Sequence, residues 1–209
     1  MRRGARMLYL RLRSAATMNT PTHFLMTAAL RKALPDWEIP RSAVYLGAVA
    51  PDVPLYLLSF GGLAYYQAGL GWTGEAAARH IFGTLYFRDP WWIALHNALH
   101  SPLSLLAGLA LTAMFTRRRL VAARWCTWFL AACLLHSIVD IFTHYDDGPV
   151  LFWPLNWNFR FSSPVSYWDH QHYGSQVAIL ELLLDLALVA YMVGPWIARK
   201  VRGFHAVAP

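Results

Sequence analysis

The longest uncharged stretch of this chain constrains its fold more than any other feature. Residues 90–116 run for 27 positions without an Asp, Glu, Lys or Arg, whereas about 20 apolar residues are enough for one helix to cross a bilayer. The whole chain agrees, because 57% of its residues are hydrophobic and only 14% are charged, a balance that water-soluble domains rarely have. The sequence therefore predicts an all-α membrane protein and disfavours a water-soluble fold.

Four other apolar stretches extend this pattern to a polytopic helical bundle of about five membrane segments. With the stretch above, the segments are residues 22–34, 43–60, 90–116, 120–142 and 176–198. The first has only 13 residues before Pro35, so it can be a half-membrane element instead of a full crossing. The second contains Pro51 and Asp52, where we expect the helix to break. After it, the glycines of residues 61–74 predict an irregular connection.

Basic residues mark one end of every predicted segment. The clusters are Arg31 with Lys32, Arg41, the arginines at 117–119, and Arg199 with Lys200 and Arg202. Lys and Arg are enriched in the cytoplasmic loops of membrane proteins. We therefore expect all these clusters on the cytoplasmic side, with the N-terminus outside and the C-terminus in the cytoplasm.

Residues 1–17 form a separate basic stretch with five arginines and no acid. We expect this extension to lie outside the fold, either upstream of a true start at Met18, as a disordered tail, or as a stretch bound to anionic lipid. Residues 18–209 are expected to form a single membrane-embedded helical domain. Without the extension the net charge falls from +7 to +2, and the remaining cations flank apolar segments, so no nucleic-acid partner is expected.

Six ionisable side chains gather at the predicted outer ends of these segments, opposite the basic clusters. They are His23, Asp52, His96, His100, His136 and Asp140. Two pairs among them are four residues apart, a spacing that puts both side chains on one helix face. A single histidine at a helix end is more often structural, but several ionisable groups at one level of a bilayer indicate a functional site. We therefore predict a metal or proton site among these six residues, and the mixture of imidazole and carboxylate suits zinc or a similar divalent ion.

A long loop rich in Trp, Phe and Pro follows the fourth segment, at residues 143–174. We expect it to cover the polar set, either as part of the site or as an aromatic cap at the membrane interface. Arg160 and His144 are the predicted substrate-binding residues, since a guanidinium suits an anionic group such as phosphate. Asp140 and Asp169 are the predicted catalytic residues, because either carboxylate can accept a proton as a general base.

Five short motifs, taken in order, resemble those of a known family. They are Thr22-His23, Gly47 to Asp52, His96 with His100-Ser101, His136 with Asp140 and Thr143, and Gly148 to Pro154. Residues 18 to about 174 are similar to the bacterial LexA-binding, inner-membrane-associated metal-dependent hydrolases, which are distantly similar to zinc-dependent phospholipase C. The resemblance implies a helical inner-membrane protein with the six residues near a divalent metal. The chain departs from the family in the spacing of His96 and His100, which makes His96 the weakest of the expected ligands.

The resemblance implies a metal-dependent hydrolase, and the mechanism follows from the proposed metal. A bound zinc ion lowers the pKa of its water and polarises a phosphoryl or acyl oxygen, so we expect attack on a phosphoester or related bond. The expected partners are membrane lipid and an amphiphilic or phosphorylated small-molecule substrate. The alternative is a non-enzymatic membrane protein with a structural or regulatory metal site, or with a proton or ion path. An open coordination position favours catalysis, four protein ligands favour a structural site, and polar groups continuing to the cytoplasmic side favour transport.

Overall fold

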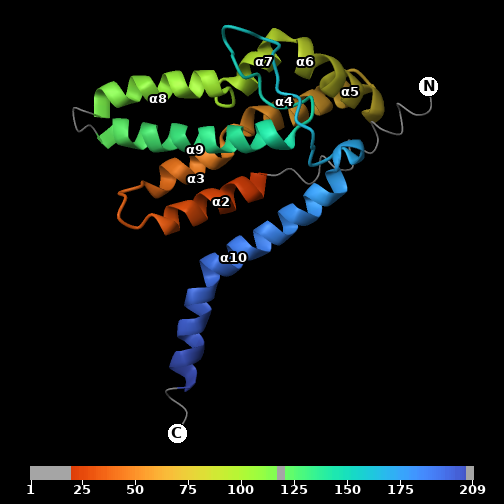
Figure 1. Cartoon of the computed structure of the whole chain (residues 1–209). Helices are drawn as coiled ribbons and strands as arrows, with labels where there is room; N and C mark the ends of the chain where they lie inside the picture. Colours follow the sequence, from red (N-terminus) through yellow and green to blue (C-terminus); the bar gives the residue numbers. More distant parts are fainter. Residues whose placement is uncertain (1–19, 117–120, 206–209) are drawn as a thin grey trace.

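The structure is a computed structural model that describes residues 20–116 and 121–205, and over these residues it contains helices and no strand (Figure 1). The α-helices are α2 (Thr20–Ala33), α3 (Arg41–Val49), α4 (Val53–Ala64), α5 (Gly74–His80), α6 (Tyr86–Arg88), α7 (Pro90–Asn97), α8 (Pro102–Thr116), α9 (Val121–Thr143) and α10 (Gly174–His205). The predicted all-α class is thereby confirmed. The basic extension at residues 1–17 and the arginines at 117–119 lie outside the described residues.

Two of these helices are long and apolar enough to cross a membrane. They are α9, with 23 residues, and the part of α10 from Gly174 to Ile197, with 24 residues. Two bent pairs, α3 with α4 and α7 with α8, raise the number of candidate spans to four if each pair crosses as one unit. Helix α2 has only 14 residues, which at 1.5 Å per residue is about 21 Å and shorter than the hydrocarbon core.

Both bent pairs break at a proline. The break expected at Pro51 and Asp52 is confirmed, because α3 ends at Val49, α4 begins at Val53, and the two helices meet at 43°. The segment predicted for residues 90–116 stays a candidate span, but as a bent pair and not as one straight helix, since α7 and α8 are bent by 47° relative to each other. Pro102 explains this second break, because proline lacks an N–H and disfavours helical geometry in the residue before it.

The glycine-rich segment after α4 is more regular than its composition predicts. Helix α4 continues through Gly61 and Gly62, and a π-helical turn follows at Tyr65–Gly69. Of the glycines with described conformation, Gly71 has a positive φ, 69°. The irregular connection expected for residues 61–74 is therefore limited to the few residues before α5.

Helices α3 and α9 approach each other closely because the facing residues are small. Ala43 and Ala48 of α3 are fully buried, and Ala132 of α9 is 4% exposed. A Cβ atom on Gly47 would meet the Phe129 carbonyl oxygen and would lie 2.8 Å from the Cβ of Ala132. Small residues at a helix interface let two backbones come together in a membrane, where lipid tails offer no hydrophobic drive to association.

Helix α10 is joined to α2 by polar contacts near both ends of the shorter helix. Thr22 donates a hydrogen bond of 2.7 Å to Glu181, and Lys32 Nζ lies 2.5 Å from the carbonyl oxygen of Tyr191. That carbonyl has no helical partner, because Pro195 supplies no N–H four residues later. Figure 1 shows α10 changing direction in its C-terminal half, as expected for a helix with an internal proline.

The close contact of α3 and α9 predicts that one methyl group added at Gly47 lowers the stability of the protein. Gly47→Ala should destabilise the protein by roughly 1–3 kcal/mol, the usual penalty for overpacking. Gly61→Ala is the matched control, since its Cβ would meet nothing within 4 Å and alanine favours a helix over glycine by about 1 kcal/mol. Thermal unfolding in detergent, followed by far-UV circular dichroism, measures both variants. Equal midpoints for the two would contradict the close approach of α3 and α9.

Candidate metal centre

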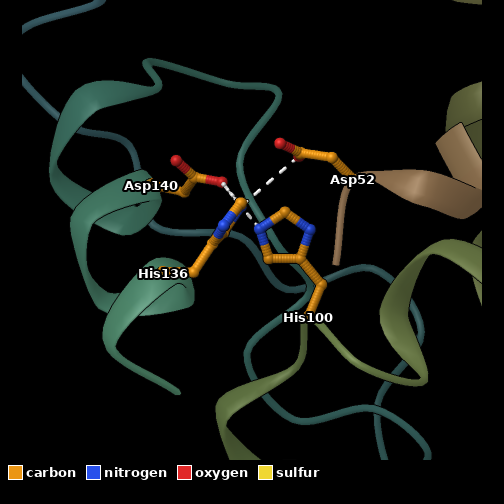
Figure 2. A group of neighbouring side chains, drawn as sticks. All are labelled: Asp52, His100, His136 and Asp140. Atoms are coloured by element: carbon orange, nitrogen blue, oxygen red, sulfur yellow. Dashed lines mark hydrogen bonds and ion pairs between the residues drawn. The ribbon is translucent and has the colours of Figure 1, made fainter. Parts of the chain in front are cut away.

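Four side chains from three parts of the chain converge inside the bundle (Figure 2). They are Asp52, His100, His136 and Asp140, and each offers one ligand atom within 4.8 Å of the others. Asp52 lies at the break between α3 and α4, His100 lies in the turn between α7 and α8, and the other two lie on α9. All four are buried, with exposures between 1% and 6%. We call these residues the four-residue cluster.

The hydrogen bond of His136 to the backbone defines what its other ring nitrogen can do. Nδ1 lies 2.8 Å from the carbonyl oxygen of Ala48, and because a carbonyl only accepts, Nδ1 carries the proton. Nε2 is buried without a hydrogen-bond partner, yet it lies 3.3 Å from Asp52 Oδ1 and 3.2 Å from Asp140 Oδ2. Two carboxylate oxygens facing this nitrogen call for a positive charge, which is either a metal ion or a second proton on Nε2.

A divalent metal suits this arrangement. Two imidazoles and two carboxylates are a normal donor set for zinc or a similar ion. The bond from His136 Nδ1 to Ala48 is the contact that orients metal-binding histidines in known sites. A second proton on His136 would also satisfy Nε2, but it would neutralise only one of the two carboxylates. The residues present therefore match a metal site, and the identity of the ion is not fixed by them.

His100 connects the four-residue cluster to His96. Its Nε2 lies 2.7 Å from Asp140 Oδ2, and its Nδ1 lies 3.0 Å from Nε2 of His96. The Ser137 hydroxyl also donates a bond of 2.5 Å to the backbone carbonyl of His100. His96 is thus buried beside the cluster and orients one of its members, whereas the sequence predicted it as a direct ligand.

His23 reaches the same site from α2. Its Nε2 lies 2.9 Å from Asp140 Oδ1, and its ring stacks on that of His136 at a centroid distance of 3.7 Å. The structure therefore brings together all six residues predicted for the metal site. Four of them can share one ion, while His23 and His96 contact those four.

Three neighbouring polar residues were missed by the sequence analysis. Thr20 donates a hydrogen bond to Asp52 and lies 2.9 Å from the hydroxyl of Tyr56. Asn97 is fully buried and accepts a bond of 2.7 Å from the backbone N–H of Val150, which ties the long loop to α7. Ser137 is the third, through its bond to His100 described above. Asn97 had a visible signal, since it is an amide inside the uncharged stretch between two histidines.

The beginning of the long loop adds an ion pair beside the cluster. His144 Nδ1 lies 3.1 Å from Asp147 Oδ1, and its Nε2 lies 3.8 Å from Asp140 Oδ1. Burial lowers the pKa of His144, but the charge and hydrogen bond of Asp147 outweigh it and raise the pKa to about 9. Burial raises the pKa of Asp147, whereas His144 and the Trp168 indole hold it below its usual value. The pair is therefore charged at neutral pH.

The other predicted loop residues are held by neighbours in the loop or by α6. Asp169 begins a short 3-10 helix, where it accepts a backbone bond from Gln171 and pairs with His172 Nδ1 at 2.9 Å. Arg160 donates to the carbonyl oxygen of Gly148 at 2.8 Å and lies over the rings of α6. Asp169 is not a member of the four-residue cluster, so its catalytic role and the substrate-binding roles of Arg160 and His144 stay predictions.

The comparisons with known proteins agree with this architecture. A family model described as YdjM inner membrane protein matches residues 18–202, which is most of the chain. No curated protein and no solved structure matches it.

The cluster predicts how metal content responds to substitution. Tag-free protein purified in detergent without chelators should carry a near-stoichiometric divalent ion, which His136→Ala and Asp140→Asn should lose. His96→Ala should keep the ion but bind it roughly 10–100-fold more weakly, the usual effect of removing a residue that orients a ligand. His170→Ala, at an exposed loop position, should behave like wild type. Elemental analysis and chelator competition measure these values, and a wild type that stays metal-free after add-back would contradict the site.

Proposed function

Because this chain belongs to the YdjM inner membrane protein family, a LexA-regulated family described as metal-dependent hydrolases, we propose that it is a membrane-bound hydrolase with a divalent metal, best matched by zinc. The observation that carries this proposal is the buried Nε2 of His136, which faces two carboxylates and has no hydrogen-bond partner. Such a nitrogen is suited to a metal and unsuited to a purely structural hydrogen-bond network.

Asp52, His100, His136 and Asp140 would hold the metal. When bound, such an ion supplies an activated water and polarises a phosphoryl oxygen. We propose Asp140 as the proton acceptor, because its Oδ2 faces His100 and His136 while its Oδ1 points away from them, toward His23 at 2.9 Å. The contacts of Asp169 with Gln171 and His172 favour a role in shaping the loop over a role in proton transfer.

The surface of the long loop supports an amphiphilic substrate. Phe152, Leu155, Trp157 and Phe159 expose between 38% and 83% of their surface, and Figure 1 shows this loop passing over α4 and α7, beside the end of α9. Apolar and aromatic side chains of this kind gather where a protein meets lipid headgroups. We therefore propose a membrane lipid, or another phosphorylated amphiphile, as the source of the bond that is cleaved.

The proposed orientation places this loop on the outer side of the bacterial inner membrane. Arg31 and Arg41 lie at the ends of α2 and α3 that are remote from His23 and Asp52, so the metal centre and these cations occupy opposite ends of the helices. Basic residues favour the cytoplasmic side. We propose five membrane segments, counting α2 and each bent pair, with the N-terminus outside and the C-terminus in the cytoplasm.

One observation favours a second function, a structural or regulatory metal site without catalysis. The four-residue cluster offers four protein ligands, none of them more than 6% exposed. Four protein ligands are the mark of a closed structural zinc site, whereas a catalytic zinc keeps a position for water. Metal content does not separate the two proposals, so turnover has to be measured directly.

Hydrolysis can be tested in mixed micelles of the purified protein with phosphatidylglycerol or phosphatidylcholine and added zinc. We expect headgroup release, seen by ³¹P NMR, to fall by about 10²-fold or more in Asp140→Asn, because the substitution removes a proposed metal ligand together with the proposed proton acceptor. His170→Ala should retain the wild-type rate. A metal-loaded wild type that cleaves no phosphomonoester or phosphodiester would reject the hydrolase and favour the structural site.

The orientation can be tested with reporters whose signal depends on the side of the membrane. A reporter inserted after Arg119 and one fused at the C-terminal end should both report the cytoplasm, while one inserted near Asp147 should report the outside. The reason is that the basic clusters lie next to the first two positions and not next to the third. The same side for Arg119 and Asp147 would rule out a crossing by α9.

A further inference from the structure

Arg160 is a half-buried cation for which the described residues provide no carboxylate within 4.0 Å. Its Nε donates to the carbonyl oxygen of Gly148 at 2.8 Å, whereas its Nη2 is buried without a hydrogen-bond partner. Among the described residues, the ion pairs of arginine are those of Arg79 with Glu75 and Arg124 with Glu38. A guanidinium nitrogen that is buried without a hydrogen-bond partner is costly, so the half-buried Arg160 is suited to an anion that the described residues do not supply.

The aromatic rings of α6 hold the guanidinium in place. Its Cζ lies 5.3 Å from the ring centroid of Tyr86 and 5.1 Å from that of Phe87. The Tyr86 hydroxyl donates to the backbone carbonyl of Asp147 at 2.5 Å, so the ring is itself fixed. Both carboxylate oxygens of Asp147 are already occupied, one by His144 and the other by the Trp168 indole. The nearby acid is therefore not available to neutralise Arg160.

A chain of contacts joins Arg160 to the four-residue cluster. The Tyr86 ring lies 5.3 Å from the ring of His96, and His96 lies 3.0 Å from Nδ1 of His100. Arg160 and the cluster thus lie on either side of Tyr86 and His96. A planar guanidinium binds phosphate oxygens in pairs, which gives orientation as well as charge.

We propose that Arg160 is a phosphate-binding residue of the substrate site, where its guanidinium receives a phosphate group of the substrate, with Tyr86 and His96 between it and the four-residue cluster. The inference rests on the proposed function in one respect, namely that the phosphate belongs to the molecule that is hydrolysed. It narrows the substrate class to anionic amphiphiles that a guanidinium can bind through paired hydrogen bonds, among which the proposed hydrolysis selects those with a phosphate group.

The test measures binding and not turnover, on full-length protein in detergent from which divalent metal has been removed. The probes are inorganic phosphate and dihexanoyl phosphatidic acid, titrated by isothermal calorimetry, with acetate and hexanoate as carboxylate controls. We expect wild type to bind a phosphate probe roughly tenfold or more tightly than Arg160→Gln, the scale of one charge-assisted hydrogen bond. The affinity of Arg160→Lys should lie between those of wild type and Arg160→Gln, because lysine keeps the positive charge but lacks the planar guanidinium that makes paired hydrogen bonds. Arg79→Gln, on the surface of α5, should match wild type.

Each outcome decides the proposal. Binding of inorganic phosphate indicates that the phosphate group alone is recognised. Binding of phosphatidic acid without binding of inorganic phosphate indicates a lipid ligand. Either result supports the proposal if Arg160→Gln loses the binding. Equal affinity in wild type and Arg160→Gln, or equal affinity for hexanoate and phosphatidic acid, would overturn it. If Arg160→Gln does not fold, Arg160→Lys decides in the same way. The binding test contains no divalent metal, so its result does not depend on hydrolysis. Phosphate binding without lipid hydrolysis would reject only the proposed hydrolase. Lipid hydrolysis without Arg160-dependent phosphate binding would reject only this inference.

Discussion

Asp140 is only 3% exposed within an apolar helix bundle, and the surrounding elements contribute partners to its carboxylate. His23 brings α2 to one oxygen, while His100 and His136 bring the α7–α8 turn and α9 itself to the other. A charge taken out of water costs several kcal/mol unless it is paired and hydrogen-bonded. Two of the surrounding segments are broken near this level, α3–α4 at Asp52 and α7–α8 at His100.

The same requirement explains why α3 and α9 must be close. His136 can donate to the Ala48 carbonyl at 2.8 Å only if the two backbones nearly touch, and Gly47 is the residue that permits this approach. The glycine therefore influences the four-residue cluster without being one of its members. Its neighbour in sequence orients a ligand, and its missing side chain sets the distance between the helices. Packing and chemistry are joined in one short motif, from Gly47 to Asp52.

Much of this site follows from residue type and spacing. Ionisable residues four apart in apolar helices must share a face and must avoid lipid, which is why the meeting of His96, His100, His136 and Asp140 was predictable. Which four of the six have ligand atoms within reach of one ion was not predictable, because it depends on the turn between α7 and α8 that separates His96 from His100. The turn could not be predicted from the uncharged stretch, since the hydropathy of residues 90–116 is the same whether they form one straight helix or two helices joined by a bend. Thr20 and Asn97 were missed because their roles depend on partners far away in the sequence.

Helix α10 is held to the rest of the protein mainly by polar contacts, and the aromatic loop beside the four-residue cluster is joined to its first residue. None of its most apolar window is buried within the described structure, and in hydrocarbon apolar contact with α2 gains little over contact with lipid. Its position therefore depends on the polar contacts of Glu181 with Thr22 and of Lys32 with the carbonyl freed by Pro195. The aromatic loop leads directly into this helix at Gly174. Lipid composition and bilayer thickness set the tilt of a lipid-facing helix. A change in the tilt of α10 would therefore move the start of the helix and the aromatic loop attached to it, beside the four-residue cluster.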